Sequence, residues 1–293
     1  MHEPVTGVVA IDKPAGVSSR RVVDAVAAAL GTRSVGHAGT LDPLAEGVVV
    51  VCVGHATKLV DFVHELPKHY VAAFLLGRSS PSDDLETPVT EEVEAVRPAA
   101  AAVAAALPAF RGLILQRPCD YSAVHVAGAR AYRLARKGRP VELAAKPVRI
   151  ERLEVVAYEW PRLELDIECS SGTFVRAIGR DLAAAIGTRA VMESLVRTAV
   201  GPFVRESALP LGDVTPAAVR AALLPAVAAV PHLPRHVLDS ATLAHAVSGG
   251  LVDLGSDAAG AVAACDESGE LVGILRRHES GRHRLRPNFR GAG

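Results

Sequence analysis

The part of this chain that most constrains its fold is the segment Gly36-His37-Ala38-Gly39-Thr40-Leu41-Asp42-Pro43-Leu44-Ala45-Glu46-Gly47. Glycines lie on both sides of Asp42, and the segment runs into Val48 to Val53, a largely β-branched run that predicts a buried strand. Pro43 fixes the backbone directly after Asp42. An isolated Asp-Pro pair usually marks only a turn, so the interpretation depends on the whole segment. We expect a rigid loop at the entrance of a strand, with Asp42 presented for chemistry.

Length and cysteine content limit the class of protein. The 293 residues are enough for one large domain and one small domain. The four cysteines lie far apart, with no C-x-x-C pair, which argues against a disulfide framework and against a zinc site. The N-terminus has no basic segment followed by an apolar one, and no apolar run is long enough to span a bilayer. We therefore expect a cytoplasmic protein that holds no metal and binds no membrane.

The distribution of charge is uneven although the total balances. The chain has 32 Lys and Arg residues and 32 Asp and Glu residues, which argues against nucleic-acid binding over the whole surface. Two basic segments nevertheless indicate a directed electrostatic surface for a polyanion. They contain Arg130, Arg133, Arg136, Lys137, Arg139, Lys146 and Arg149 against Glu142, and Arg276, Arg277, Arg282, Arg284, Arg286 and Arg290 against Glu279. Acidic residues gather elsewhere, at Asp83, Asp84, Glu86, Glu91, Glu92 and Glu94.

Apolar spacing, caps and turn residues predict the order of the elements. Strands are expected at 7–11, 48–53, 68–77 and 163–169. Helices are expected from Ser18 or Ser19 to Leu30, from Pro98 to Leu107, from Ala129 to Arg136 and from Ser170 to Ile186. An alanine- and proline-rich segment at 210–234 predicts a helical connector, and hairpin strands are expected beyond residue 260.

Arg176 falls in the first turn of the last of these helices. The helix dipole disfavours a cation at this end by roughly a few tenths of a kcal/mol. A cation in this position is expected to pair with an anion, so the sequence indicates a carboxylate partner for Arg176.

The segment around Asp42 resembles the signature of the bacterial TruB-type tRNA pseudouridine synthases, and further blocks occur in the family's order. They are Asp12-Lys13-Pro14-x-Gly16, Gly54-x-Ala56-Thr57-Lys58, Lys68-x-Tyr70, Tyr121-Ser122-Ala123, Ala131-Tyr132-x-x-Ala135-Arg136-x-Gly138 and Cys169-Ser170-x-Gly172-Thr173-Phe174-x-Arg176. Seven ordered blocks make a chance match implausible. The resemblance implies an α/β (α+β) pseudouridine synthase fold, with a large mixed, mainly antiparallel sheet flanked by helices and loops and a small β-rich PUA-like C-terminal domain.

The resemblance also implies roles for individual residues. The signature aspartate is the family's catalytic nucleophile, which assigns that role to Asp42 and makes Arg176 its bidentate partner. Tyr70 is expected to stack on the target uracil, as a candidate base for the C5 proton. Further contacts with the flipped base or its vacated space are implied for His37, Phe174 and Leu195. Contacts with RNA phosphates are expected from Lys13, Lys58, Arg130, Arg133, Arg136 and Lys137. No cofactor is needed, because the reaction changes no oxidation state.

The expected division of the chain follows from the same resemblance. Residues 1–207 form a catalytic domain with a thumb-like RNA-binding insertion at about 119–147, residues 208–234 form a connector, and residues 235–293 form a PUA-like RNA-binding domain. The implied substrate is the T-arm of tRNA, with uridine 55 converted to pseudouridine by a monomer. The family's loop pattern is altered at 79–86, His125 replaces a usual lysine, and Phe174 replaces a common tyrosine.

Two other functions remain open from the sequence. The altered loop and His125 are compatible with a non-catalytic tRNA-binding or folding factor of the same fold. A hydrolase that uses an Asp-Arg pair on a small metabolite is the third reading, but no further base or metal constellation accompanies that pair. Release of tritium from uridine labelled at C5 separates catalysis from binding.

Overall fold

The computed structural model describes residues 5–122, 125–126, 129–130, 134, 143–255 and 260–290. Its largest feature is a mixed, mainly antiparallel sheet, as expected from the sequence. In spatial order the main path runs β14 (Leu209–Pro210), β1 (Gly7–Lys13), β3 (Glu46–Val53), β12 (Ala190–Val200), β4 (Lys68–Leu76), β11 (Arg162–Cys169), β10 (Lys146–Glu159) and β7 (Gly112–Gln116). Short strands β2 (Val35–His37) and β13 (Phe203–Val204) pair with β3 and β12. Among the described residues, the β1–β14 and β3–β12 pairs of this sheet are parallel and its other pairs are antiparallel.

Strand β3 is apolar throughout because both of its faces are buried. Val49, Val51 and Val53 pack into the core that lies against helix α1 (Ser19–Leu30). The alternate residues Val48, Val50 and Cys52 pack on the other face, against the 3-10 helix η1 (Gly54–Leu59) and α2 (Val60–Glu65). The predicted strand is therefore confirmed as a central strand, and the catalytic-loop candidate enters it directly.

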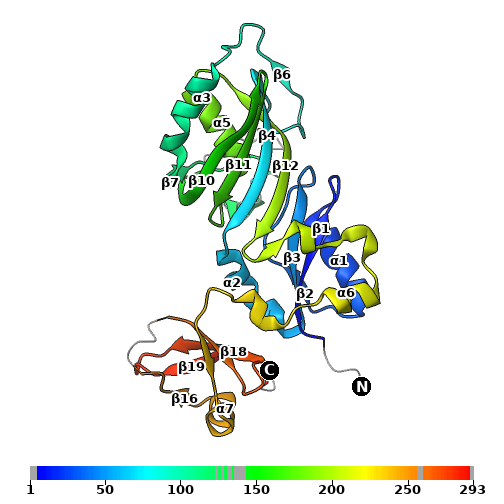
Figure 1. The fold of residues 1–293 in the computed structure, drawn as a ribbon, viewed down its shortest axis with the longest axis vertical. Helices are drawn as coiled ribbons and strands as arrows, with labels where there is room; N and C mark the ends of the chain where they lie inside the picture. The colour runs from blue at the N-terminus through cyan, green and yellow to red at the C-terminus, as the bar shows by residue number, and fades with distance from the viewer. Residues whose placement is uncertain are drawn as a thin grey trace.

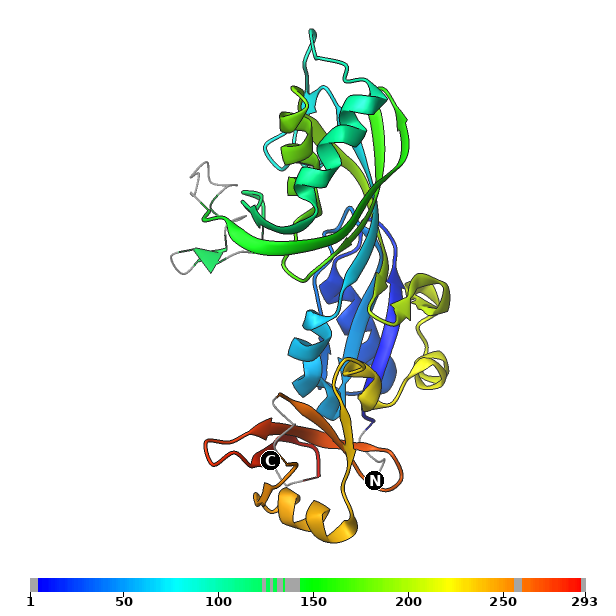
Figure 2. The same cartoon turned by 60° about the vertical axis from the view of Figure 1, so that its left-hand side comes forward.

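The caps of α1 agree with the sequence pattern. The side chain of Ser18 accepts a hydrogen bond from the Arg21 N–H, and Gly31 ends the helix in the left-handed region with φ 64°. Helix α3 (Ala100–Ala106) begins two residues after Pro98 and continues into the 3-10 helix η2 (Leu107–Phe110). Figure 2 shows α3 and α5 (Val175–Ala185) on one face of the strongly curved part of the sheet.

Two helix predictions need correction. Residues Ala129–Arg130 form strand β9, which pairs with β8 (His125–Val126), so the helix expected from Ala129 does not begin there. The rest of that expected helix, to Arg136, lies largely outside the described residues. Helix α5 begins at Val175 without a side-chain cap from the preceding Ser-Thr segment. Its start is held instead by Gln116 of β7, as described below.

The remaining elements link and complete the two sheets. A short hairpin of β5 (Arg78–Ser79) and β6 (Thr90–Glu91) projects from the end of β4. Between β13 and β15 the chain forms η3 (Arg205–Ser207), η4 (Leu211–Asp213), α6 (Pro216–Ala222) and η5 (Ala226–Ala229), and α6 lies beside α1 (Figure 1). The second sheet has the order β15 (Arg235–Val237), β17 (Val262–Cys265), β18 (Leu271–Arg277), β19 (His283–Asn288) and β16 (Leu251–Val252).

The C-terminal sheet packs with α7 (Ser240–Val247) around a small core of its own. It lies at the opposite end of the molecule from the β5–β6 hairpin (Figures 1 and 2). Arg276 of this sheet contacts helix α2, because its guanidinium lies 5.0 Å from the ring centroid of Phe62. No helix within the described ranges is both long and apolar enough to cross a membrane.

The contact between α5 and β4 gives a prediction for stability. A Cβ atom at Gly179 would lie 2.0 Å from the Phe74 ring, and Phe74 is buried in the core. We expect Gly179→Ala to lower the free energy of unfolding by about 1–3 kcal/mol despite the higher helix propensity of alanine. Gly212→Ala is the matched control, because a Cβ there would meet no atom within 4 Å. Equal urea midpoints for the two variants would contradict this packing.

Candidate active site

A pocket opens in the large sheet where the Gly36–Gly47 segment meets α5. Its cavity has a volume of about 150 Å³, on the scale of one pyrimidine ring. The lining combines one carboxylate, one guanidinium, hydroxyls and apolar side chains, and consists of Thr40, Leu41, Asp42, Tyr70, Ser122, Thr173, Phe174, Val175, Arg176 and Leu195. Five of the six residues expected to be catalytic or substrate-binding therefore meet in one pocket.

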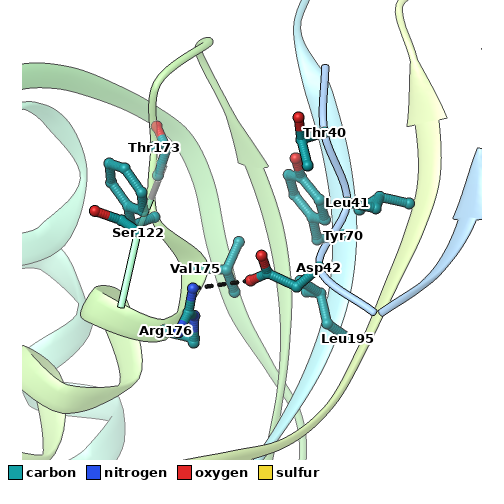
Figure 3. Close-up of a pocket in the computed structure, with 10 residues that line it drawn as sticks. Thr40, Leu41, Asp42, Tyr70, Ser122, Thr173, Val175, Arg176 and Leu195 are labelled. Carbon is teal, nitrogen blue, oxygen red and sulfur yellow. Dashed lines mark ion pairs between the residues drawn. The ribbon is translucent and has the colours of Figure 1, made fainter. Parts of the chain in front are cut away.

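Asp42 and Arg176 form the ion pair that the sequence predicted (Figure 3). Arg176 Nη2 lies 2.9 Å from Asp42 Oδ2. The arginine side chain is 6% exposed, whereas the aspartate side chain is 41% exposed and faces the pocket. Arg176 also donates to the carbonyl oxygens of Ser82 at 2.8 Å and Tyr121 at 3.0 Å. These contacts fix the cation, while the carboxylate keeps an accessible face.

The pair is not bidentate, which corrects the expectation. The second guanidinium nitrogen, Arg176 Nη1, lies 3.1 Å from Oδ2 of Asp84, whose side chain is 2% exposed. Arg176 is therefore shared between an accessible carboxylate and a buried one. Burial raises the pKa of Asp42, the charge of Arg176 opposes this rise, and Asp84 adds to it. The fraction of Asp42 that is ionised thus depends on how Arg176 is held.

Asp84 was missed as a site residue because the sequence placed it in an acidic surface cluster. The loop of residues 79–86 folds around its side chain: Ser82 Oγ donates to Oδ1 at 2.5 Å, and the Glu86 N–H donates to the same oxygen at 2.9 Å. Thr87 Oγ1 accepts from the Ser82 N–H at 3.1 Å. Nothing in the local sequence distinguished Asp84 from the neighbouring acidic residues. The altered loop still delivers a carboxylate to Arg176.

The loop that carries Asp42 is held from beneath by three hydrogen-bond donors. Ser19 Oγ accepts from the Leu41 N–H at 2.8 Å and donates to the Leu41 carbonyl at 3.1 Å. The Gly16 N–H donates to the Pro43 carbonyl at 2.7 Å. Lys13 Nζ donates to the carbonyl oxygen of Ala45 at 2.5 Å. The expected rigidity of the loop is therefore explained by contacts from the turn and helix that precede it.

The expected RNA contact at Lys13 is wrong. Its side chain is fully buried, and Nζ donates to the carbonyl oxygens of Pro14 and Val17 as well as Ala45. All three ammonium hydrogens are used, so none remains for a phosphate. Burial lowers the pKa of Lys13 to about 8, which is the expected direction for a desolvated ammonium group.

Aromatic and aliphatic side chains form the walls of the pocket. In Figure 3, Tyr70 and Leu195 lie on the same side as Asp42, whereas Ser122 and Thr173 lie across the cavity. Tyr70 is 9% exposed and Leu195 is 7% exposed. The backbone of Phe174 is clamped by Gln116, whose Oε1 accepts from the Phe174 N–H at 2.8 Å and whose Nε2 donates to its carbonyl at 3.1 Å. Gln116 was not singled out from the sequence.

The other expected contact residues lie elsewhere. His37 is on β2, paired with Val51, and is not part of the pocket lining. Lys58 is exposed on η1. Arg133, Arg136 and Lys137, together with the side chain of Arg130, lie outside the described residues. The described residues contain no group of His, Cys, Asp and Glu arranged to hold a metal ion.

The role of Ser19 gives a direct test of the support for the loop. Ser19→Ala leaves the buried Leu41 N–H without its partner, so we expect stability to fall by roughly 1–3 kcal/mol and activity to fall with it. Ser18→Ala is the matched control: it removes only the cap of α1, at a cost of about 1 kcal/mol, and leaves the loop contacts in place. The free energy of unfolding and the rate of product formation are measured for both variants. An equal loss of activity in both variants would contradict the special role of Ser19.

Comparison with known structures gives the fold. The chain superposes on one in a crystal structure of a Cbf5-Nop10-Gar1 complex with a TM-score of 0.75 and 24% identity, covering 97% of this chain and 85% of the other. A structure of an H/ACA RNP bound to a substrate RNA containing 2'-deoxyuridine gives a TM-score of 0.73 and 22% identity, covering 97% and 84%. These likenesses show the fold, which is that of the pseudouridine synthases.

Comparison of sequences then shows the family. The family model described as TruB family pseudouridylate synthase (N terminal domain) matches residues 28–175. A tRNA pseudouridine synthase B from Mycobacterium tuberculosis is 41% identical over 277 residues, covering 92% of this chain and 91% of the relative. Another from Mycolicibacterium paratuberculosis is 39% identical over 286 residues, covering 92% and 93%. The chain belongs to the TruB family, and it is a pseudouridine synthase, an isomerase.

Proposed function

We propose that this enzyme converts uridine to pseudouridine in the T-arm of tRNA, at position 55, with Asp42 as the nucleophile. The observation that carries this proposal is the accessible carboxylate of Asp42, paired with the buried Arg176 at the floor of a pocket for one ring. The curated relatives are named tRNA pseudouridine synthase B, which supports tRNA as the substrate. The T-arm comes from the resemblance of the signature and its neighbouring blocks.

The reaction needs a small set of groups. The bond between N1 and C1′ breaks, the base turns, and a bond between C5 and C1′ forms. Asp42 attacks either C1′ of the sugar or C6 of the ring, and both routes require its ionised form. Arg176 favours that form, whereas the burial of Asp42 opposes it. The C5 hydrogen leaves as a proton and N1 gains a proton, so the product is an isomer of the substrate.

The base must leave its stack to reach Asp42, because a uridine inside a folded arm is shielded. Extrusion costs about a few kcal/mol, which stacking and phosphate contacts must offset. Tyr70, Phe174 and Leu195 supply the apolar walls for the extruded ring. The proposed phosphate contacts are Lys58 and the thumb residues Arg130, Arg133, Arg136 and Lys137. The basic residues of the proposed RNA-binding domain, 235–293, extend this surface.

The experiment uses full-length tRNA transcripts labelled with tritium at C5 of uridine. The proposal predicts that one tritium equivalent is released per tRNA. It also predicts that this release is lost when uridine 55 is replaced by cytidine. A binding or folding factor would retain the transcript without releasing tritium. Release that persists in the cytidine transcript would refute the assigned position while leaving the activity in place.

A further inference from the structure

A second buried arginine lies beneath the pocket, and its charge has no use in the mechanism above. Arg197 is on β12, two residues beyond Leu195 and therefore on the same face of the strand. It is 2% exposed and is among the largest fully buried side chains. Its register partners are Tyr70 on β4 and Gly47 at the end of the catalytic loop. Arg197 thus sits between the nucleophile's loop and the aromatic wall.

Backbone carbonyls, rather than carboxylates, hold this arginine. Its Nε donates to the Val48 carbonyl at 2.7 Å, and its Nη2 donates to the Gly39 carbonyl at 3.0 Å. These two residues flank the loop that carries Asp42. Within the described ranges, no carboxylate oxygen lies within ion-pair distance of Arg197. Burying a cation without a counter-charge is costly, so a neutral donor would serve the two carbonyls at lower cost.

Tyr70, the register partner of Arg197 on β4, is a neighbour that can use this charge. Burial raises the pKa of the Tyr70 hydroxyl, and nearby Cys169 and Asp42 also raise it. The charge of Arg197, the cross-strand partner of Tyr70, acts in the opposite direction. A phenolate that forms at Tyr70 would therefore be stabilised by the Arg197 guanidinium.

We propose that Arg197 is a positioning residue that prepares Tyr70 to accept the C5 proton of the rotated base. This inference rests on the proposed function. Tyr70 first gives its hydroxyl proton to solvent, and the resulting phenolate is stabilised by Arg197. After C5 has joined C1′, the bond between C5 and its hydrogen breaks and the proton moves to the phenolate oxygen, which restores the phenol. The electron pair of that bond forms the double bond between C5 and C6. In the route through C1′, the π pair of the C6–N1 double bond moves to N1, which takes a proton from solvent; in the route through C6, the bond between C6 and the Asp42 oxygen breaks and returns the carboxylate.

The test compares the rates of product formation from tRNA with protium or deuterium at C5 of uridine, under single-turnover conditions. Arg197→Lys keeps a cation but shortens its reach, and Arg197→Gln keeps donors without charge. We expect each to slow product formation at least about tenfold, within the range of general-base contributions. The deuterium effect should grow in both variants, because removal of the C5 proton becomes rate-limiting. The thermal unfolding midpoint and the affinity for tRNA are measured for both variants, and the kinetic comparison uses each variant that folds and binds tRNA.

Two comparisons separate this role from simple support of the loop. Ser19→Ala loosens the same loop without touching Tyr70, so it should slow the reaction with no growth of the deuterium effect. In a Tyr70→Phe background, Arg197→Lys should cause no further loss. A deuterium effect that stays at the wild-type value in both Arg197 variants, or losses that multiply in the double variant, would overturn the proposal. No product from the wild-type enzyme would refute the proposed function itself, and this inference with it.

Discussion

Arg176→Met is expected to lower product formation by about a thousandfold or more and the free energy of unfolding by about 3–5 kcal/mol. The stability loss has a defined cause: Asp84 is 2% exposed and would lose the cation that compensates its charge. The loss of activity follows from Asp42, which would lose the group that orients it and favours its ionised form. Single-turnover kinetics and urea unfolding measure the two effects on the same preparation.

Arg176→Lys isolates the electrostatic part of this effect. An ammonium group cannot reach two carboxylates and two carbonyls in the planar arrangement of the guanidinium. Burial raises the pKa of Asp42, and the charge of Arg176 lowers it. A weaker ion pair in the variant reduces the second effect, so the pKa of Asp42 rises further above its usual value. The ionised fraction is lost as pH falls, and the deficit of the variant should therefore be largest at low pH and shrink as pH rises.

Arg180→Lys provides the matched control on the same helix. Arg180 lies one turn beyond Arg176, pairs with Asp83 at 3.2 Å and with Asp181 at 2.8 Å, and does not line the pocket. We expect its pH profile to match that of the wild-type enzyme. An acid limb that moves equally in both variants would show that helix α5, rather than the pair with Asp42, sets the pH dependence.

Much of this site could be predicted from local sequence. The largely β-branched run of β3 indicated a buried strand, and the position of Arg176 in a first helical turn indicated a carboxylate partner. Ser18 and Gly31 marked the ends of α1. These features succeeded because each depends on residues close together in the chain or on the helix dipole.

The sequence could not supply contacts that depend on tertiary packing. Gln116 reaches Phe174 across 58 positions, and Arg197 reaches Gly39 across 158 positions. Lys13 beside a proline-glycine turn suggested a solvated or phosphate-binding side chain, but three carbonyls converge on its ammonium group. Asp84 was indistinguishable from its acidic neighbours until the fold placed it beside Arg176. Polar side chains buried by distant segments carry no periodic signal.

Asp42→Asn is the second variant with a very large expected effect. The amide keeps the size of the side chain and can still lie beside Arg176, but it lacks the nucleophilic carboxylate. Loss of an essential nucleophile costs on the order of 10⁴-fold or more in other enzymes, and we expect a loss of that size here. Affinity for tRNA should change by less than about tenfold, because phosphate contacts rather than Asp42 supply most of it.

The central claim is that the carboxylate of Asp42, held by Arg176, performs the isomerisation. Its most direct test is the amount of pseudouridine formed in unmodified tRNA by saturating Asp42→Asn enzyme, measured by nucleoside mass spectrometry after one wild-type turnover time and after a long incubation. The account predicts bound tRNA with no detectable pseudouridine at either time. Pseudouridine formed at a rate within about tenfold of the wild-type enzyme would contradict it.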